Sequence, residues 1–145
     1  MTDSTPRGIR NCNPGNIRKS PTAWLGEDPN GEDPDFVTFK SPLYGIRALA
    51  KILWSYQDVH GINTVSGFIN RWAPPGENDT TAYVQNVCAA CEVSPDTTID
   101  LKSSVFYNLV IAIITQENGE QPYAIDLIAQ AISMVRPNNV AAAPT

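Results

Sequence analysis

Glu117 is the residue whose type and position most strongly suggest chemistry. It ends the apolar helical stretch 103–117, and an Asn-Gly pair follows it directly. At helical spacing it continues a stripe of Phe106, Val110 and Ile113, which predicts that its carboxyl group faces the core. Burial and the negative end of the helix dipole both favour the protonated acid, the form that a general acid in sugar-bond cleavage requires. The alternative is a frayed helix end whose glutamate turns into solvent.

A glycosidase of the usual kind needs a second carboxylate as nucleophile or base. The candidates are five acidic residues in one short loop: Glu27, Asp28, Glu32, Asp33 and Asp35. Such a density of acids is more typical of a solvated loop.

Two polar segments could surround this acid. The segment 7–18 is rich in Asn, Gly and Pro, and its Asn side chains could either lock a turn or bind sugar amides and hydroxyls. The segment 72–80 combines a tryptophan, a proline pair and a capping cluster, and it forms either a cleft wall or a plain helix connection. The candidate substrate-binding residues come from these segments and their neighbours: Asn13, Asn16, Tyr44, Asn78, Thr80, Tyr83 and Tyr123.

Other chemistries find little support in the sequence. The net charge of −5 and a pI near 4.7, without a basic block, argue against nucleic acid or an anionic membrane as partner. A zinc set of Cys12, Cys88, Cys91 and His60 would need ligands from distant segments, whereas small buried cysteines on one helical face are the simpler interpretation. No His-Glu-x-x-His motif or glycine-rich phosphate loop is present. We therefore expect no metal and no cofactor.

Length and composition predict a single domain, and we expect a monomer. The 145 residues suit one domain over 7–136, with a flexible leader over 1–6 and a flexible tail over 137–145. The longest apolar run, 109–114, is far shorter than a membrane span, and the N-terminus does not resemble a signal peptide. We expect synthesis in a host cytoplasm, with no membrane insertion, and action at the cell wall after release or delivery.

The elements that must position these residues are mainly helices. Ser41-Pro42 predicts the start of a helix that runs to about His60. Further helices are expected after a cap at Asn63 or Thr64 to about residue 72, after a cap at Asn78 or Asp79 over 80–91, from a cap at Asp100 to Glu117, and at 124–135. Only 16–18 and 36–39 have strand character, which predicts a small N-terminal β-hairpin. The expected fold class is α+β, mainly α, with helices over more than a third of the chain.

Several ordered motifs carry a family resemblance. They are Arg7–Arg18, Trp24-Leu-Gly26, Phe36–Phe39, Tyr44–Ala48, Arg71–Thr80, Tyr83 and Glu117-Asn-Gly with Pro122-Tyr123. Together they resemble a family of small phage lysis or virion-associated proteins, over roughly residues 7 to 135. The segment 13–48 is also similar to the β-lobe of bacterial glucosaminidases and related lysozyme-like enzymes.

The resemblance implies a lysozyme-like fold and peptidoglycan as substrate. Those relatives keep the catalytic Glu at the end of a helix before the β-lobe, whereas here the candidate helix comes late, which implies a circularly permuted order with Glu117 as the acid. The implied activity is cleavage of the N-acetylmuramic acid–N-acetylglucosamine β-1,4 bond, by a lytic transglycosylase or muramidase used in phage infection or lysis. A lytic transglycosylase needs a single acid, which protonates the glycosidic oxygen and then removes the proton of the muramyl 6-hydroxyl as an anhydro ring closes. A lone Glu117 fits this route slightly better than hydrolysis. The alternatives are a non-catalytic virion or wall-binding protein and a peptidoglycan endopeptidase.

Overall fold

Apolar side chains at helical spacing build most of the chain into a helical body. The computed structural model describes residues 4–137, so the leader and tail expected at 1–6 and 137–145 lie mostly outside the described residues. The helices are α1 Arg7–Arg10, α2 Pro42–Asp58, α3 Val65–Trp72, α4 Thr80–Cys91, α5 Val105–Asn118 and α6 Ile125–Ser133. The mainly helical fold is confirmed, with helices over more than a third of the chain. None of the helices in this part of the chain is long and apolar enough to span a membrane.

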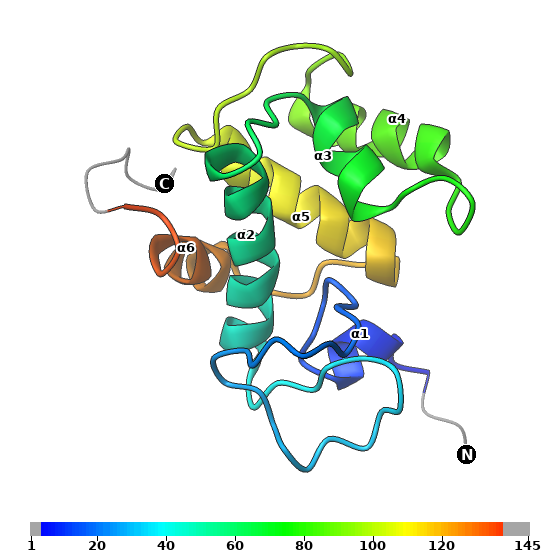
Figure 1. The fold of residues 1–145 in the computed structure, drawn as a ribbon, viewed down its shortest axis with the longest axis vertical. Helices are drawn as coiled ribbons and strands as arrows, with labels where there is room; N and C mark the ends of the chain where they lie inside the picture. Colours follow the sequence, from blue (N-terminus) through cyan, green and yellow to red (C-terminus); the bar gives the residue numbers. More distant parts are fainter. Residues whose placement is uncertain (1–3, 138–145) are drawn as a thin grey trace.

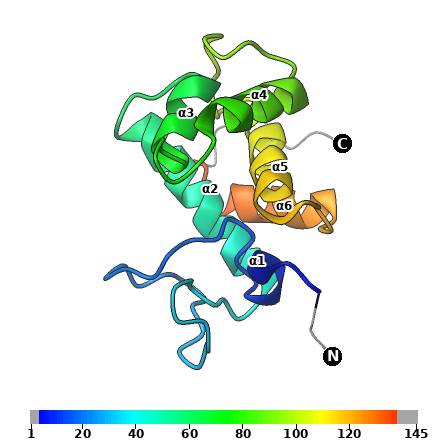
Figure 2. The ribbon, with the colours of Figure 1, turned by 90° about the vertical axis from the view of Figure 1, so that its right-hand side faces the viewer.

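Helix α2 is the centre of the arrangement (Figures 1 and 2). In Figure 1 it runs from the N-terminal lobe at the bottom to the end of the body near α3, and α6 packs along its side. Helix α5 crosses behind it and packs along α4. Most of the largest buried side chains, Leu49, Leu53, Phe68, Phe106 and Ile113 among them, come from α2, α3 and α5. One continuous core therefore fixes the direction in which α5 ends.

The helix starts follow the capping signals in most cases. Ser41 has extended backbone, and Pro42 begins α2 as predicted. The Thr64 hydroxyl accepts a hydrogen bond from Gly67 N at the start of α3, and the Asp79 carboxylate accepts one from Ala82 N at the start of α4. These three predicted starts are confirmed.

The predicted start of α5 at Asp100 is wrong. Asp100 Oδ1 accepts hydrogen bonds from Lys102 N and Gln57 Nε2, so its side chain closes a turn before the helix. The carbonyl groups of the following turn accept hydrogen bonds from the buried Arg136 guanidinium, which also donates to the Tyr107 hydroxyl. Helix α5 starts only at Val105 because the preceding backbone is committed to these contacts.

The N-terminal lobe, residues 11–41, contains no strand, so the predicted β-hairpin is not supported. Its antiparallel pairing is limited to the isolated bridges Arg18–Phe36 and Glu27–Phe39 within the described chain. The Asn13 side chain takes the place of regular backbone pairing between strands. Asn13 Nδ2 donates to the carbonyls of Ile17 and Val37, and Asn13 Oδ1 accepts from Ile17 N. Backbone groups that are satisfied by side chains do not need regular strand pairing.

A small apolar cluster ties this lobe to the first turns of α2. Ile17, Val37 and Phe39 pack against Ala48, and all four are buried. Gly45 of α2 lies so close to the backbone of Cys12 that a side chain there would overlap the Cys12 carbonyl oxygen. The lobe therefore rests on α2 by direct backbone contact, which holds residues 12–16 in place.

Candidate functional site

Glu117 occupies the last turn of α5 and is held on both of its carboxylate oxygens. Phe106, Val110 and Ile113 are fully buried, which confirms the predicted stripe, and Glu117 continues it as a half-buried side chain. Asn16 Nδ2 donates to Glu117 Oε1 at 3.1 Å, and the Tyr83 hydroxyl donates to Oε2 at 2.9 Å. Because two donors fix the carboxyl group, the frayed-end alternative is wrong.

The N-terminal lobe reaches Glu117 through a short backbone segment. Asn16 has a left-handed backbone (φ 51°), which turns its amide toward the end of α5. Asn118 Nδ2 donates to the carbonyl of Pro14 at 2.8 Å and so joins the same segment to the helix. Gly8 of α1 makes room, since a Cβ atom there would lie 2.6 Å from Asn118 Oδ1 and 2.7 Å from Asn16 Oδ1. The proximity that the permuted order required between Glu117 and the Asn13–Ile17 segment is thus present.

Tyr83 supplies the second contact from α4. Its side chain is only 4% exposed. Burial raises the pKa of Tyr83 well above its ordinary value, and the charge of Glu117 and the hydrogen bond to it raise this pKa further. A hydrogen bond with Trp72 acts in the opposite direction. The phenol therefore stays protonated and serves as a neutral donor to the carboxylate.

Replacing Tyr83 by Phe should lower the free energy of unfolding by about 1 kcal/mol at neutral pH, because a half-buried carboxylate oxygen loses its donor. The folded-state pKa of Tyr83 lies above its unfolded value of about 10. The stabilisation that the protonated Tyr83 provides is therefore complete below about pH 10, the unfolded pKa, and is lost as the pH rises above it. Urea unfolding at about pH 7 and about pH 10.5 checks this: the gap between wild type and Tyr83→Phe should narrow at the higher pH. Tyr44→Phe, at a tyrosine away from Glu117, is the matched control, and an unchanged gap would contradict the assignment.

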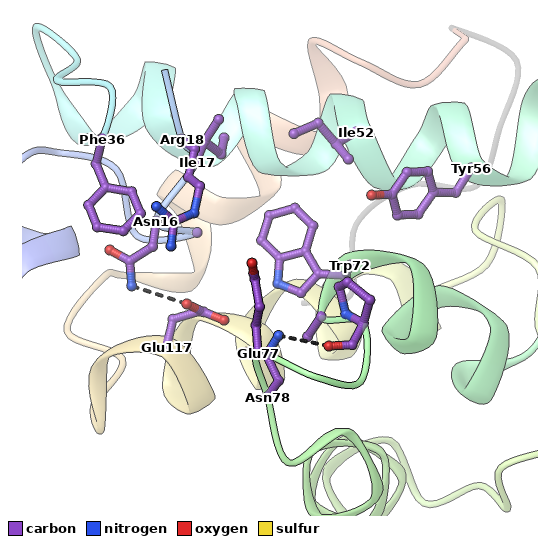
Figure 3. A pocket seen from close by; sticks show the side chains of 13 residues that line it. Asn16, Ile17, Arg18, Phe36, Ile52, Tyr56, Trp72, Glu77, Asn78 and Glu117 are labelled. Atoms are coloured by element: carbon purple, nitrogen blue, oxygen red, sulfur yellow. Dashed lines mark hydrogen bonds between the residues drawn. The ribbon is translucent and has the colours of Figure 1, made fainter. Parts of the chain in front are cut away.

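A pocket of about 370 Å³ opens beside Glu117 (Figure 3). Its wall on one side comes from the N-terminal lobe and its wall on the other from the α3–α4 connection, with α2 between them. The lining residues are Gly15, Asn16, Ile17, Arg18, Phe36, Ile52, Tyr56, Trp72, Ala73, Pro74, Glu77, Asn78 and Glu117. Apolar and aromatic walls with a few converging polar groups are typical of small-molecule sites.

The structure brings together only some of the predicted substrate-binding residues. Asn16 and Asn78 line the pocket with Glu117, and Tyr83 contacts Glu117. The segment 72–80 does form a wall, as one of its two interpretations held.

Four of the predicted binding residues have other roles or positions. Asn13 is fully buried and locks the lobe, and the buried Thr80 hydroxyl donates to the Ala73 carbonyl at 2.6 Å. Tyr44 packs in the lobe cluster, and Tyr123 packs against the main core, where burial raises its pKa to about 12. These two tyrosines are not among the lining residues. The polar groups of Asn13 and Thr80 are thus engaged within the fold and the two tyrosines lie outside the pocket, which the residue types alone did not reveal.

The acidic loop also differs from its candidate role. None of its five carboxylates lines the pocket. Asp33 instead accepts from Arg7 Nε and Nη2 at 2.6 Å and from Asn11 Nδ2 at 2.9 Å, and the Arg7 guanidinium holds the pKa of Asp33 well below its usual range. The carboxylate that does line the pocket with Glu117 is Glu77. The sequence could have indicated Glu77, because it lies in the segment 72–80 that was predicted as a possible cleft wall.

The cysteines do not gather with the histidine. Cys88 and Cys91 are buried on α4, as the simpler interpretation had it, while Cys12 lies in the N-terminal lobe. Within residues 4–137, no three His, Cys, Asp or Glu side chains are placed to hold a metal ion.

A comparison with known proteins gives the chain a family. No protein-family model matches it. It is 38% identical over 125 residues to Protein P5 of Pseudoalteromonas phage PM2, and the match covers 84% of this chain and 77% of the phage protein. The chain belongs to the family of Protein P5. The protein that contains the Glu117 pocket therefore has a relative in a phage.

Proposed function

We propose that the protein is a phage peptidoglycan glycosidase of lysozyme-like type, with Glu117 as its catalytic acid. The observation that supports this best is the position of the Glu117 carboxyl group: it ends an apolar helix, borders a pocket and is oriented by Asn16 and Tyr83. The bond cleaved is the β-1,4 bond between N-acetylmuramic acid and N-acetylglucosamine. The phage relative suits a role in host lysis or infection, in which the protein is made in the host cytoplasm and reaches the cell wall on release or in the virion.

Each residue around Glu117 has a defined task in this reaction. The protonated Glu117 transfers its proton to the glycosidic oxygen as the bond to the muramyl anomeric carbon breaks. The Asn16 amide and the Tyr83 hydroxyl then stabilise the carboxylate that remains, since both donate to it. The carboxylate next removes the proton of the muramyl 6-hydroxyl, whose oxygen bonds to the anomeric carbon and closes the anhydro ring. Glu117 ends the cycle protonated.

The pocket walls suit a sugar strand. Trp72 and Tyr56 lie on one side and Phe36 on the other, and flat rings pack well against the apolar faces of sugars (Figure 3). The amide of Asn78 offers polar contacts at the pocket rim for acetamido and hydroxyl groups. Asn78 Nδ2 donates to the Pro74 carbonyl, which leaves its carbonyl oxygen as the acceptor.

The test is product analysis. Purified peptidoglycan is incubated with the wild-type protein, with Glu117→Gln as the blank, and the products are identified by mass spectrometry. Anhydromuropeptides support the transglycosylase and reducing muramyl ends support the muramidase. Free amines would instead identify an endopeptidase, and binding to the wall without any product would identify a non-catalytic protein; either result overturns the proposal.

Glu77→Gln separates the one-acid route from hydrolysis with two carboxylates. Glu77 lines the pocket but is exposed, on a connection between helices. A nucleophile must be held firmly to react, so we expect this variant to keep its turnover within about threefold of wild type. The measurement is the rate of release of soluble muropeptides, with Glu92→Gln at an exposed position at the end of α4 as control. A loss of about a hundredfold or more would assign Glu77 as the second carboxylate and favour the muramidase.

A further inference from the structure

Arg18 differs from Arg7 of α1, which is also an arginine in contact with Phe36. The guanidinium groups of both Arg7 and Arg18 lie over the Phe36 ring, at 4.4 and 5.1 Å from its centroid. Arg7 is committed to carboxylates, at 2.6 Å from Asp33 and 3.3 Å from Asp35. Arg18 is exposed and forms no ion pair with any carboxylate in the described part of the chain. Its position is therefore set by an aromatic ring, while its donors remain available to a ligand.

The charges of the residues that line the pocket indicate a role for Arg18. Its lining includes two acids, Glu77 and Glu117, and Arg18 is the one basic residue among the lining residues. A glycan strand that carries carboxylates would be repelled by these acids and by the net charge of −5. Figure 3 shows Arg18 and Phe36 on the same side of the pocket as Asn16, with Tyr56 on the opposite side. A glycan strand bound along the pocket would thus contact Arg18 on the side of the pocket where Asn16 donates to Glu117.

We propose that Arg18 is a specificity residue that binds a carboxylate of the muramyl unit beside the cleaved bond, an inference that rests on the proposed function. A guanidinium pairs with a carboxylate through two parallel hydrogen bonds, and the Arg18 guanidinium lies over the Phe36 ring at the pocket. The carboxylate has two possible sources, the lactyl group of a peptide-free muramyl residue and the acidic residues of the stem peptide. Neutral polymers of N-acetylglucosamine lack both, so Arg18 distinguishes peptidoglycan from them.

Calorimetric binding to the full-length protein in a Glu117→Gln background tests this without turnover. Three ligands are compared: a neutral tetrasaccharide of N-acetylglucosamine, a peptide-free tetrasaccharide with muramyl residues, and the same tetrasaccharide carrying stem peptides. Adding Arg18→Gln should raise the Kd of at least one carboxylate-bearing ligand about tenfold and leave the Kd of the neutral ligand within about twofold. The ligand that responds identifies the source of the carboxylate.

Arg10→Gln is the matched control, because Arg10 is an exposed arginine of the same lobe region that does not line the pocket. It removes the same charge and should leave all three Kd values unchanged. An equal loss for neutral and charged ligands, or no loss for either, overturns the assignment of Arg18 but leaves the glycosidase standing. If the Glu117→Gln parent binds none of the three ligands, the proposed function and this inference both fall.

Discussion

Glu117→Gln should reduce peptidoglycan cleavage by about a thousandfold or more, since general acid catalysis contributes about a hundredfold to ten-thousandfold and no other acid is fixed in the pocket. Glutamine has the same shape and keeps an acceptor for Asn16 or Tyr83, so the fold should be retained. The measurement is the initial rate of muropeptide release, with thermal unfolding of both proteins as the check on folding. Selective loss of turnover would identify Glu117 as the proton donor.

The control for this prediction is Glu120→Gln. Glu120 is exposed and lies two residues beyond the end of α5, so the substitution removes the same charge three positions from Glu117 without changing a residue that lines the pocket. Its activity should stay within about twofold of wild type, because exposed charges contribute little. Turnover of Glu117→Gln that equals that of Glu120→Gln would remove Glu117 from the mechanism.

Gly45→Ala should destabilise the protein by about 3 kcal/mol or more, the upper range for an overfilled contact. Its new Cβ atom would overlap the Cys12 carbonyl oxygen and lie 2.8 Å from the Cys12 carbonyl carbon and 3.1 Å from Pro14 Cδ. Backbone atoms cannot rotate away as a flexible side chain can, so α2 and the segment 12–16 must separate. The melting temperature should fall by roughly 10 °C, measured by circular dichroism.

Gly67→Ala provides the comparison for Gly45→Ala. It also replaces a helical glycine, but its Cβ atom would meet only side-chain atoms, Ile62 Cγ2 at 2.9 Å and the Thr64 hydroxyl oxygen at 3.1 Å. Alanine favours the helix by up to about 1 kcal/mol, which offsets part of the cost of moving these side chains, so the loss of stability should be clearly smaller than for Gly45→Ala. Similar melting temperatures for the two variants would show that the contact with Cys12 is not tight.

The parts of the fold that could be predicted from sequence depend on local interactions. Pro42, Thr64 and Asp79 mark helix starts because a cap acts on residues within one turn. The direction of Glu117 was predictable for a similar reason: the stripe of apolar residues along one helix states which face is buried. Asp100 has the residue type of a cap, but its side chain accepts a hydrogen bond from Gln57, which is far away in the sequence, and α5 begins later, at Val105.

The parts that could not be predicted depend on distant contacts. Asn13 satisfies backbone groups near residue 37, so the strand-like residues of the lobe form isolated bridges instead of a hairpin. Arg18 and Glu77 reach one pocket from segments on either side of α2, and neither segment contains a pattern that points to the other. Asn16 was a reasonable candidate by type, but its bond to Glu117 spans 101 positions in the sequence.

That separation between Asn16 and Glu117 has a consequence for the order of events during synthesis. A contact between such distant residues closes a long loop, and it forms only after the intervening segment has been made. The ribosome releases the N-terminal lobe first and the end of α5 only after helices α2, α3 and α4. A nascent or truncated chain that stops before residue 117 has the lobe but not the acid. The site can therefore form only after synthesis has passed residue 117.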